Sequence, residues 1–444
     1  MECLVRFAQA HQDFRKAEIE ALATLAAVDL EFLVYHDYTP FSIIKVPDEA
    51  AARKFVQRSI LTQNIYELWG QGTTYEELFN DIRARTSNRW PDYRLLSFRF
   101  NIDSYGSRRS AKEKKGIIES FAFLGFQGPI KMVGADEEFC VFEEYARNSD
   151  TSLGPRKLYF GRWFTAGSRD AIDSYDLKKR QYISTTSMDA ELSLISANLA
   201  HAAPGKLFFD PFVGTGSFCV AMAHFGAIAL GSDIDGRSFK GKDKEKGVPM
   251  GLLSNLRQYG LEAGFLDAFA SDITNTPLRN IRLFDGIICD PPYGVREGLK
   301  VLGSRDENNK RIAMLDGAPI YTRDDFVHPK RPYSFEAMLD DILEFAARML
   351  VSNGRISFWM PTANDDDVAL EIPGNPHLEL ISVCIQPFNK WSRRLLTYRR
   401  LTEGETLTPS YSPKQTRDPP KSGTADDLNP FRRKYFQSTK LDSS

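Results

Sequence analysis

Paired cysteines and metal-ligand patterns are missing from this sequence. Its five cysteines are an odd number, scattered along 444 residues, and no two of them form a C-x-x-C pair. Such a set indicates neither a disulfide framework nor a zinc site, and the six histidines also lack metal-ligand spacing. We therefore predict no metal in this chain and expect a reducing compartment, the cytoplasm.

Long apolar runs and a dominant charge are missing as well. Charged residues interrupt every window of about 18 residues, which argues against membrane spans, and the N-terminus shows no signal-peptide pattern. Lys and Arg (57) nearly balance Asp and Glu (59), so the formal net charge is only -2. Any surface for nucleic acid must therefore be a local patch.

The length predicts two or three domains. Residues 1–70 and 71–150 mix strand-like and helix-like segments and are predicted as two α+β domains. Turn-forming residues cluster near residue 150, so residues 151–180 are predicted as a linker. Residues 181–402 read as an α/β domain, and residues 403–444, rich in Pro, Ser, Thr and charge, as a disordered tail.

Short apolar runs alternate with helix-length segments in the α/β part. The last two runs are close enough to form a hairpin, and the seven runs are residues 206–209, 227–231, 268–271, 284–289, 355–360, 378–385 and 395–398. This alternation predicts a doubly wound, Rossmann-like parallel sheet of seven strands. Sheets of this kind bind their ligands at the carboxyl ends of the strands.

A glycine-rich turn follows the first of these strands. It begins at Asp210, and Gly214 and Gly216 allow backbone N–H groups to approach a ligand closely. A dinucleotide fingerprint would need a third glycine where Cys219 stands, and no G-K-[ST] marks a phosphate loop. The dehydrogenase and NTPase interpretations are both weakened.

Acidic residues follow the next two strands. Asp233 and Asp235 come after the second strand, where a carboxylate can bind the ribose hydroxyls of a nucleoside cofactor. Asp272 follows the third strand and adds another acid at the same edge. Helix capping is the alternative role for such residues.

The fourth strand ends in the motif Asp290-Pro291-Pro292-Tyr293. Prolines cannot donate to the strand ladder, so they end the strand and leave carbonyl groups projecting. The Asp290 carboxylate and the Pro291 carbonyl can both accept hydrogen bonds from one exocyclic NH2 group, and Tyr293 offers a ring for base stacking. The motif predicts a site for an amine on a planar ring.

In these two motifs the sequence resembles the class I S-adenosylmethionine-dependent methyltransferases that modify exocyclic amino groups of nucleobases. A longer set of matches resembles the catalytic subunit of the eukaryotic tRNA guanosine N2-methyltransferases that act at position ten: Arg169–Asp173, Tyr182–Asp189, Asn198, Asp210–Ser217 and Gly231–Asp235. The resemblance implies a ferredoxin-like domain over residues 1–70 and a THUMP RNA-binding domain over residues 71–150, with most of residues 155–400 as the methyltransferase part.

The resemblance also implies roles for individual residues. Gly214 and Gly216 would contact the methionine part of S-adenosylmethionine, and Asp210 would also bind the cofactor. Asp233 would bind its ribose, with Asp235 as a weaker second candidate. Asp272 would bind its adenine. Asp290, Pro291, Pro292 and Tyr293 would orient the guanine N2 for direct methyl transfer without a covalent intermediate.

Two basic segments are candidates for tRNA contact. The segment from Ile82 to Lys115 contains ten Lys and Arg residues but only three acidic residues. Aromatic residues are interleaved with these cations, a pattern that favours binding of phosphates and bases. A second basic aromatic segment precedes the last strand. The RNA-binding candidates are Arg94, Arg99, Arg108, Arg109, Lys112, Lys390, Arg393 and Arg394. A solvated surface with the aromatic residues in the core is the alternative.

Two further features concern partners and access. The resemblance implies a small zinc-binding activator subunit in a heterodimer, and the apolar segment Leu261–Ala270 could be the exposed sheet edge that receives it. The long polar insertion Val295–Tyr333 is interpreted as a substrate-gating flap. Within the tail, the basic cluster Phe431–Phe436 could contact RNA, but a solvated tail is the favoured interpretation.

Alternative functions remain open at this point. The Asp-Pro-Pro-Tyr motif presents the same acceptors to any exocyclic amine, so a DNA adenine or cytosine amino-methyltransferase is the nearest rival. A non-catalytic RNA-binding protein that keeps the methyltransferase fold is the second. Cys289 could suggest a nucleophile, but it lies inside an apolar strand and is interpreted as a core residue.

Overall fold

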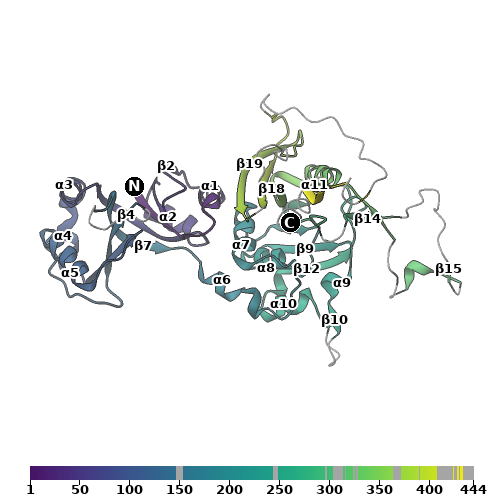
Figure 1. The fold of residues 1–444 in the computed structure, drawn as a ribbon, viewed down its shortest axis with the longest axis horizontal. Coiled ribbons are helices and arrows are strands. Elements are labelled where there is room, and N and C mark those ends of the chain that lie inside the picture. Colours follow the sequence, from purple (N-terminus) through teal and green to yellow (C-terminus); the bar gives the residue numbers. More distant parts are fainter. Residues whose placement is uncertain are drawn as a thin grey trace, which may run out of the picture. The chain divides into compact units, whose positions relative to one another are not determined.

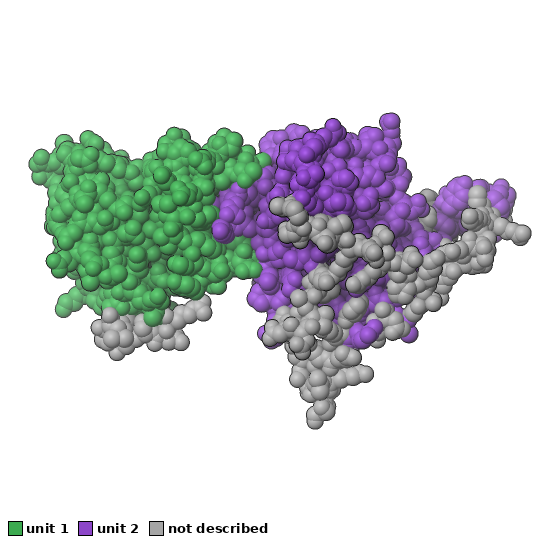
Figure 2. Space-filling view, turned by 90° about the horizontal axis from the view of Figure 1, so that it is seen from above, with its two compact units in different colours: residues 1–15, 22–169 green, residues 16–21, 170–444 purple. Residues whose placement is uncertain are grey.

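The computed structural model describes most of the chain in two compact units. The described residues are 1–146, 154–243, 249–295, 298–303, 314–315, 317–323, 326, 329–363, 372–389, 391–407, 424, 428–429 and 431–433. One unit comprises residues 1–15 and 22–169, and the other comprises residues 16–21 and 170–444 (Figure 2). Within the described ranges, no helix is long and apolar enough to cross a membrane.

The first unit is built on a single seven-stranded sheet with the strand order β2-β3-β1-β4-β7-β6-β5 (Figure 1). Its strands are β1 (Glu2–Phe7), β2 (Glu31–Val34), β3 (Phe41–Lys45), β4 (Thr62–Gly72), β5 (Phe98–Tyr105), β6 (Glu137–Glu144) and β7 (Lys157–Ala166). The helices of the first 169 residues are α1 (Arg15–Ala26), α2 (Glu49–Val56), α3 (Tyr75–Thr86), α4 (Trp90–Tyr93) and α5 (Ala111–Ser120). Only the β5–β6 pair is parallel.

Strict alternation along β6 divides the core of this unit between the two faces of the sheet. Phe139 and Val141 pack in one apolar cluster with Trp69, whereas Cys140 and Phe142 pack in another. Successive side chains of a strand point to opposite faces, so a strand with apolar residues at every position is buried on both sides. The sheet is therefore the central layer of the unit.

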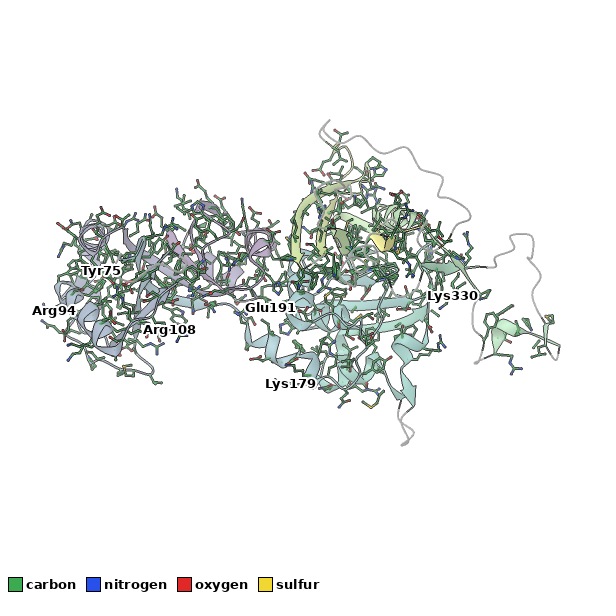
Figure 3. The ribbon with its side chains drawn as sticks, viewed as in Figure 1. Tyr75, Arg94, Arg108, Lys179, Glu191 and Lys330 are labelled. Atoms are coloured by element: carbon green, nitrogen blue, oxygen red, sulfur yellow. The ribbon has the colours of Figure 1, made fainter. Side chains whose placement is uncertain are left out.

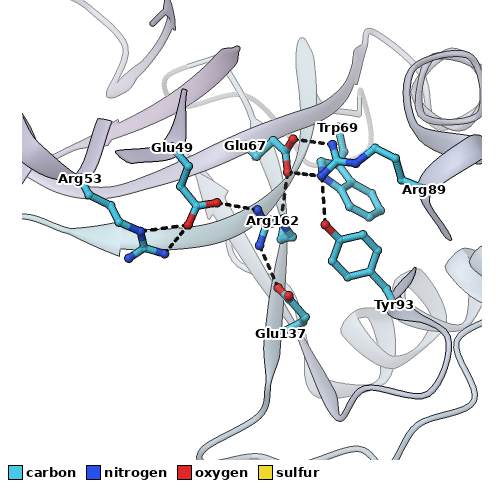
Figure 4. A network of polar contacts seen from close by, with 8 residues as sticks. All are labelled: Glu49, Arg53, Glu67, Trp69, Arg89, Tyr93, Glu137 and Arg162. Carbon is cyan, nitrogen blue, oxygen red and sulfur yellow. Dashed lines mark hydrogen bonds and ion pairs between the residues drawn. The ribbon is translucent and has the colours of Figure 1, made fainter. Parts of the chain in front are cut away.

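A network of ionic hydrogen bonds crosses the middle of this sheet (Figure 4). Arg162 of β7 donates to Glu67 of β4 at 3.0 Å, to Glu137 of β6 at 3.2 Å and to Glu49 of α2 at 2.9 Å. Arg89 also donates to Glu67. Burial alone would raise the pKa of Glu67, but the hydrogen bonds from Arg89, Trp69 and Arg162 outweigh it and hold that pKa below its usual range. The network joins strands and a helix that are distant in sequence.

The sheet also joins the two domains predicted for residues 1–150. β4 pairs with β7, and β7 pairs with β6, so both predicted domains contribute to one continuous sheet. Residues 157–166, which fall in the predicted linker, form β7, and the compact units divide after residue 169. The turn-forming cluster thus precedes a strand that returns to the sheet, and residues 147–153 of that cluster lie outside the described ranges.

The second unit contains the predicted Rossmann-like sheet. Its strand order is β12-β9-β8-β13-β18-β20-β19, with parallel pairing from β12 to β18 and antiparallel pairing of β20 on both sides. The strands are β8 (Leu207–Asp210), β9 (Ile228–Asp233), β12 (Phe265–Ala270), β13 (Phe284–Cys289), β18 (Leu350–Ala363), β19 (Leu378–Pro387) and β20 (Trp391–Arg400). The fold-class prediction is confirmed.

Helices cover both faces of this sheet (Figure 1). Phe358 of β18 belongs to the apolar cluster that contains Ile342 of α11. The next residue, Trp359, faces the other way and donates its indole N–H to Ser196 of α7 at 3.2 Å. The helices are α6 (Asp170–Ser174), α7 (Ala190–Leu199), α8 (Ser217–His224), α9 (Arg237–Lys240), α10 (Leu252–Gln258) and α11 (Phe335–Met349).

Short strand pairs complete the described part of this unit. They are β10 (Lys242–Asp243) with β11 (Pro249–Met250), β14 (Lys300–Leu302) with β17 (Lys330–Pro332), and β15 (Met314–Leu315) with β16 (Ala318–Pro319). The β14–β17 and β15–β16 pairs lie in the segment predicted as a flap, much of which is outside the described residues.

Part of the predicted disordered tail is packed. Leu428, Asn429 and Phe431 are buried, and the amide of Phe335 at the start of α11 donates to the carbonyl of Leu428 at 3.0 Å. Polar composition around these residues concealed two apolar side chains that the second unit buries. The prediction of a disordered tail is wrong for this short segment.

Candidate active site

The parallel strands bring the predicted acids to one edge of the sheet. Asp210 ends β8, Asp233 ends β9, and Asp290 directly follows β13. These three strands are neighbours, with β8 between the other two. Residues far apart in sequence therefore meet at the carboxyl edge, where such sheets bind ligands.

Backbone geometry explains the glycines of the loop after β8. Gly214 and Gly216 both have positive φ values, 48° and 84°, which are costly for other residues. A Cβ atom on Gly216 would lie 2.5 Å from Leu252 of α10, so a larger residue would also clash. The Gly214 N–H donates to Asp233 Oδ2 over 3.1 Å, which ties the loop to the end of β9.

Asp210 carries a buried carboxylate oxygen that is not satisfied by the chain. Its side chain is 1% exposed, and Oδ1 accepts from the Phe212 N–H at 3.0 Å. Oδ2 has no partner among the described residues. Burial raises the pKa of Asp210 well above its usual range, and the nearby charges of Asp233 and Asp290 raise it further. An incoming cationic or N–H donor would relieve this site, so the residue fits a cofactor that carries an ammonium group.

The two acids after β9 differ in their environment. Burial raises the pKa of Asp233, although the N–H groups of Asp235 and Gly214 donate to it. Asp235 instead accepts three hydrogen bonds from Arg237, which lower its pKa to about 2. Asp235 is therefore paired within its own turn, and Asp233 is the better ribose candidate.

Asp272 is occupied by its own surroundings. Its Oδ1 accepts from the Thr274 N–H and hydroxyl and from the Asn275 N–H, at 2.7 to 2.9 Å. Its Oδ2 accepts from the Leu302 N–H of β14 at 2.6 Å. Because a carboxylate has about four acceptor positions, only Oδ2 has room for a donor from a ligand. The predicted adenine contact stays a prediction on that one oxygen.

The predicted catalytic motif forms a compact hydrogen-bonded loop. Tyr293 donates its hydroxyl to Asp290 Oδ1 at 2.6 Å. Burial raises the pKa of Asp290 to about 6, and the Tyr293 hydrogen bond and the positive charge of Arg393 limit that rise. The Tyr293 ring, predicted to stack on a base, makes an edge contact with Trp391 at 6.1 Å. Pro291 is buried and Pro292 is exposed.

Arg393, a predicted RNA contact, is held in place by contacts within the chain. Its side chain is only 15% exposed, and its guanidinium stands over the rings of Trp359 and Phe388 at 4.6 and 5.7 Å. It also faces Asp189 at 3.8 Å. Arg394 is half-buried in the same strand, and Lys390 lies outside the described residues.

Sequence analysis did not identify two buried residues that support the glycine loop. Arg180 is buried and donates to the Ser217 hydroxyl at the start of α8 at 2.8 Å. Asn255 is fully buried and donates to the Thr215 carbonyl at 3.2 Å and to the Tyr182 carbonyl at 2.7 Å. Neither belongs to a motif with a recognisable spacing, so only the folded chain shows their place beside the glycine loop.

The basic segment of the first unit divides into exposed and paired residues. Arg94, Arg108 and Lys112 are exposed (Figure 3 labels the two arginines). Arg109 donates to Glu143 at 2.9 and 3.1 Å, and Arg99 pairs with Glu138. The interleaved aromatics Trp90, Tyr93, Phe98 and Phe100 pack against the core cluster of Trp69, and Tyr105 packs against the cluster on the opposite face. Packing against the core therefore explains the aromatic residues of this segment.

Comparisons with known proteins agree with this geometry. Residues 1–169 match the family model described as the Tmrp11 THUMP N-terminal domain, and residues 178–303 match the RMKL-like methyltransferase domain. The chain is 42% identical to the tRNA (guanine(10)-N(2))-methyltransferase of Saccharomyces cerevisiae, over 98% of this chain and 99% of the yeast protein. The chain belongs to the tRNA (guanine(10)-N(2))-methyltransferase family. The Homo sapiens member, TRMT11, is 34% identical over 98% of this chain and 94% of the human protein.

A solved structure also resembles the chain. TrmN from Thermus thermophilus is similar with a TM-score of 0.44 and 15% sequence identity, over 90% of this chain and 100% of that chain. The family membership confirms the predicted enzyme class, and the methyltransferase domain confirms S-adenosylmethionine as the cofactor.

Proposed function

We propose that this chain transfers a methyl group from S-adenosylmethionine to the exocyclic N2 of guanosine 10 in tRNA. The observation that carries the proposal is the Asp290 loop at the carboxyl edge of the sheet, in a chain that matches curated tRNA (guanine(10)-N(2))-methyltransferases along nearly its full length. These matches favour tRNA over the rival DNA substrate and favour an enzyme over a non-catalytic binding protein.

The glycine loop and the neighbouring acids hold the cofactor in this proposal. Gly214 and Gly216 bring the backbone close to the methionine part, Asp210 accepts from its ammonium group, and Asp233 binds the ribose hydroxyls. The cofactor supplies a methyl group on a sulfonium, which is already a strong electrophile. The chain therefore needs to supply alignment and charge placement rather than a nucleophile.

Asp290 and Pro291 orient the amine. The Asp290 carboxylate and the Pro291 carbonyl accept the two N–H bonds of the guanine N2, which directs its lone pair toward the methyl group. As the N–C bond forms, the amine loses a proton to Asp290 or to water. Burial raises the pKa of the Cys289 thiol well above its usual range, so the neighbouring cysteine stays a thiol, which argues against a covalent step.

The RNA contacts proposed here come from both units. In the first unit, Arg94, Arg108 and Lys112 are the exposed cations that can reach phosphates. In the second, Arg393 and Arg394 lie on β20 beside the catalytic loop. Arg99 and Arg109 act mainly through their ion pairs, which order the surface that carries the exposed cations.

A small zinc-binding activator subunit is the proposed protein partner. β12 pairs with β9 on one side only and is one of the two edge strands of the methyltransferase sheet, the other being β19. Leu266 on this edge is 63% exposed, and Ile281 and Leu283 nearby in sequence are exposed as well. An uncovered apolar edge is an association site, which supports a heterodimer formed there. None of the five cysteines, all of which lie within the described residues, forms a disulfide bond, which supports the proposed cytoplasmic location.

Methyl transfer from labelled S-adenosylmethionine tests the function. Unmodified tRNA and duplex DNA are incubated with the full chain, with and without the activator, and the products are analysed as nucleosides. We expect N2-methylguanosine in tRNA, and Asp290→Ala should nearly abolish it while cofactor binding is largely kept. N6-methyladenine or N4-methylcytosine in DNA would overturn the substrate, and absence of transfer under every condition would overturn the enzyme.

A further inference from the structure

The end of the chain contacts the loop that carries the catalytic motif. Asn429 is 2% exposed, and its Nδ2 donates to the carbonyl of Tyr293 at 2.8 Å. Arg432 donates to the carbonyl of Gly294 at 2.8 Å and also to that of Val295. Three consecutive carbonyls, beginning with that of Tyr293 at the end of the motif, are thus bound by two side chains more than a hundred residues away in sequence.

The fit between the two segments is close. Gly294 has a φ of 70°, and a Cβ atom placed on it would lie 2.6 Å from Asn429 Nδ2. A glycine is required here because the Asn429 side chain occupies the space beside it. The Asn429 Oδ1 accepts from the Arg432 N–H at 3.0 Å, so Asn429 also holds the turn that presents Arg432.

Apolar contacts connect the same segment to the catalytic tyrosine. Phe431 is 2% exposed, and its ring lies 5.9 Å from that of Trp391. Trp391 in turn contacts the ring of Tyr293. The Tyr293 hydroxyl donates to Asp290. The C-terminal segment therefore supports Tyr293 at its backbone and at its ring.

We propose that Asn429, Phe431 and Arg432 form a C-terminal clamp that positions the catalytic loop for methyl transfer. The inference rests on the function proposed above and extends it. Without the clamp, the three carbonyls of residues 293–295 lose their donors and the loop can leave the geometry in which Tyr293 holds Asp290. The clamp residues are positioning residues, because they act through Tyr293 and do not touch the reacting atoms.

Asn429→Asp and Arg432→Ala test the clamp in the full chain with the activator present. Asn429→Asp keeps the Oδ1 acceptor that caps the turn but removes the Nδ2 donor to Tyr293. Arg433→Ala is the matched control, because its exposed side chain carries the same charge one residue away. Arg432→Lys keeps the charge and can restore one donor, so it should regain part of the activity that Arg432→Ala loses.

The expected signature is a fall in kcat, on the order of 10-fold or more, because a small displacement of a catalytic group is costly. Cofactor affinity, thermal midpoint and KM for tRNA should change little. Since the Tyr293 hydrogen bond lowers the pKa of Asp290, the acidic limb of the kcat profile should move to higher pH. In a Tyr293→Phe background, Asn429→Asp should add little further loss, because both act on one interaction.

Other outcomes would contradict the clamp. An increase in KM for tRNA alone, equal in Arg432→Ala and Arg433→Ala, would make the segment an RNA contact and overturn the clamp. Unchanged kinetics, or a joint loss of thermal midpoint and cofactor affinity, would also overturn it. Failure of the proposed function appears separately, as a wild-type chain that makes no N2-methylguanosine or an Asp290→Ala chain with full activity.

Discussion

In the proposed function Asp290 accepts the guanine amine, so the protonation state of its carboxyl group decides whether it can do so. Burial raises its pKa to about 6, whereas the Tyr293 hydroxyl and the Arg393 charge oppose that rise. A protonated Asp290 has lost one acceptor, so the reaction needs the ionised form. Burial therefore brings the titration of Asp290 closer to neutral pH than that of an ordinary aspartate.

We expect kcat/KM to fall as the pH drops below about 6, the pKa of Asp290. Tyr293→Phe removes a hydrogen bond that favours the ionised carboxylate, so the acidic limb should move to higher pH. The measurement is a pair of pH–rate profiles, one with tRNA in excess for kcat and one with limiting tRNA for kcat/KM. Tyr333→Phe, whose hydroxyl donates to Asp341 instead, should leave the limb in place. A limb that is the same in all three proteins would contradict this role.

We predict that the Asp210 carboxylate destabilises the cofactor-free fold but contributes to cofactor binding. Its folded-state pKa is raised, so its ionisation destabilises the fold increasingly as the pH rises above the unfolded value near 4. Asp210→Asn keeps the Oδ1 acceptor for Phe212 and removes the charge. The cofactor-free variant should melt at a higher temperature than wild type, with a larger difference at pH 8 than at pH 5, and should bind S-adenosylmethionine more weakly. Equal affinities measured by calorimetry would exclude Asp210 from the cofactor site.

At the scale of elements, the edge strand β12 is the feature that predicts a partner. Leu266→Lys places a charge on the exposed apolar edge without disturbing the core, because the side chain is already 63% exposed. The variant should no longer copurify with the activator subunit, whereas Leu253→Lys, an exposed leucine of α10, should copurify normally. Retained binding by Leu266→Lys would place the partner elsewhere.

The strands of the methyltransferase unit were predictable from their apolar runs. The run 284–289 is β13 without change, and the run 378–385 is the first part of β19. The start of α7 depends on which of two neighbouring polar residues acts as the cap: Asp189 does so and accepts from the Leu192 N–H. Ser187 instead bonds the Thr215 hydroxyl at 2.7 Å, a contact between segments that local pattern does not encode.

The acids of the candidate site followed from strand ends, whereas their environments did not. A strand that ends in Asp places the carboxylate at the sheet edge, so Asp210, Asp233 and Asp290 could be found from spacing alone. Arg237 pairs with Asp235 within one turn, and the spacing of the two residues did not reveal this pair. The bond from Asn429 to Tyr293 depends on a tertiary contact. In the basic aromatic segment, the sequence pattern did not distinguish core residues from surface residues. Its aromatic residues pack against the core, and only some of its cations are exposed.

At the scale of the whole molecule, the network around Arg162 holds the first unit together. Its side chain is 14% exposed and bonds three carboxylates from three elements. Arg162→Met leaves these acids without their shared partner, and the free energy of unfolding of this unit should fall by about 3 kcal/mol. Arg53→Met, which removes an exposed pair with Glu49 and the contact of the guanidinium with the Phe164 ring at 5.5 Å, should cost less than about 1 kcal/mol. Chemical denaturation of the full chain, followed by a probe in this unit, measures both.

If the two substitutions destabilise the unit equally, the network contributes no more than an ordinary surface ion pair. Methyl transfer should be kept in both variants below the melting temperature, because the cofactor site lies in the other unit. A loss of tRNA affinity in Arg162→Met at low temperature would instead indicate that the network shapes the RNA-binding surface.

The central place of β7 has a consequence for the order in which the chain folds during synthesis. β7 is the last strand of its sheet to be made, yet it lies between β4 and β6 and is the only strand that joins them. Until residue 166 has left the ribosome, the strands on either side have no shared partner and their edges stay open. A nascent chain that stalls before this point presents two unpaired sheet edges to chaperones, whereas one that passes it closes both at once.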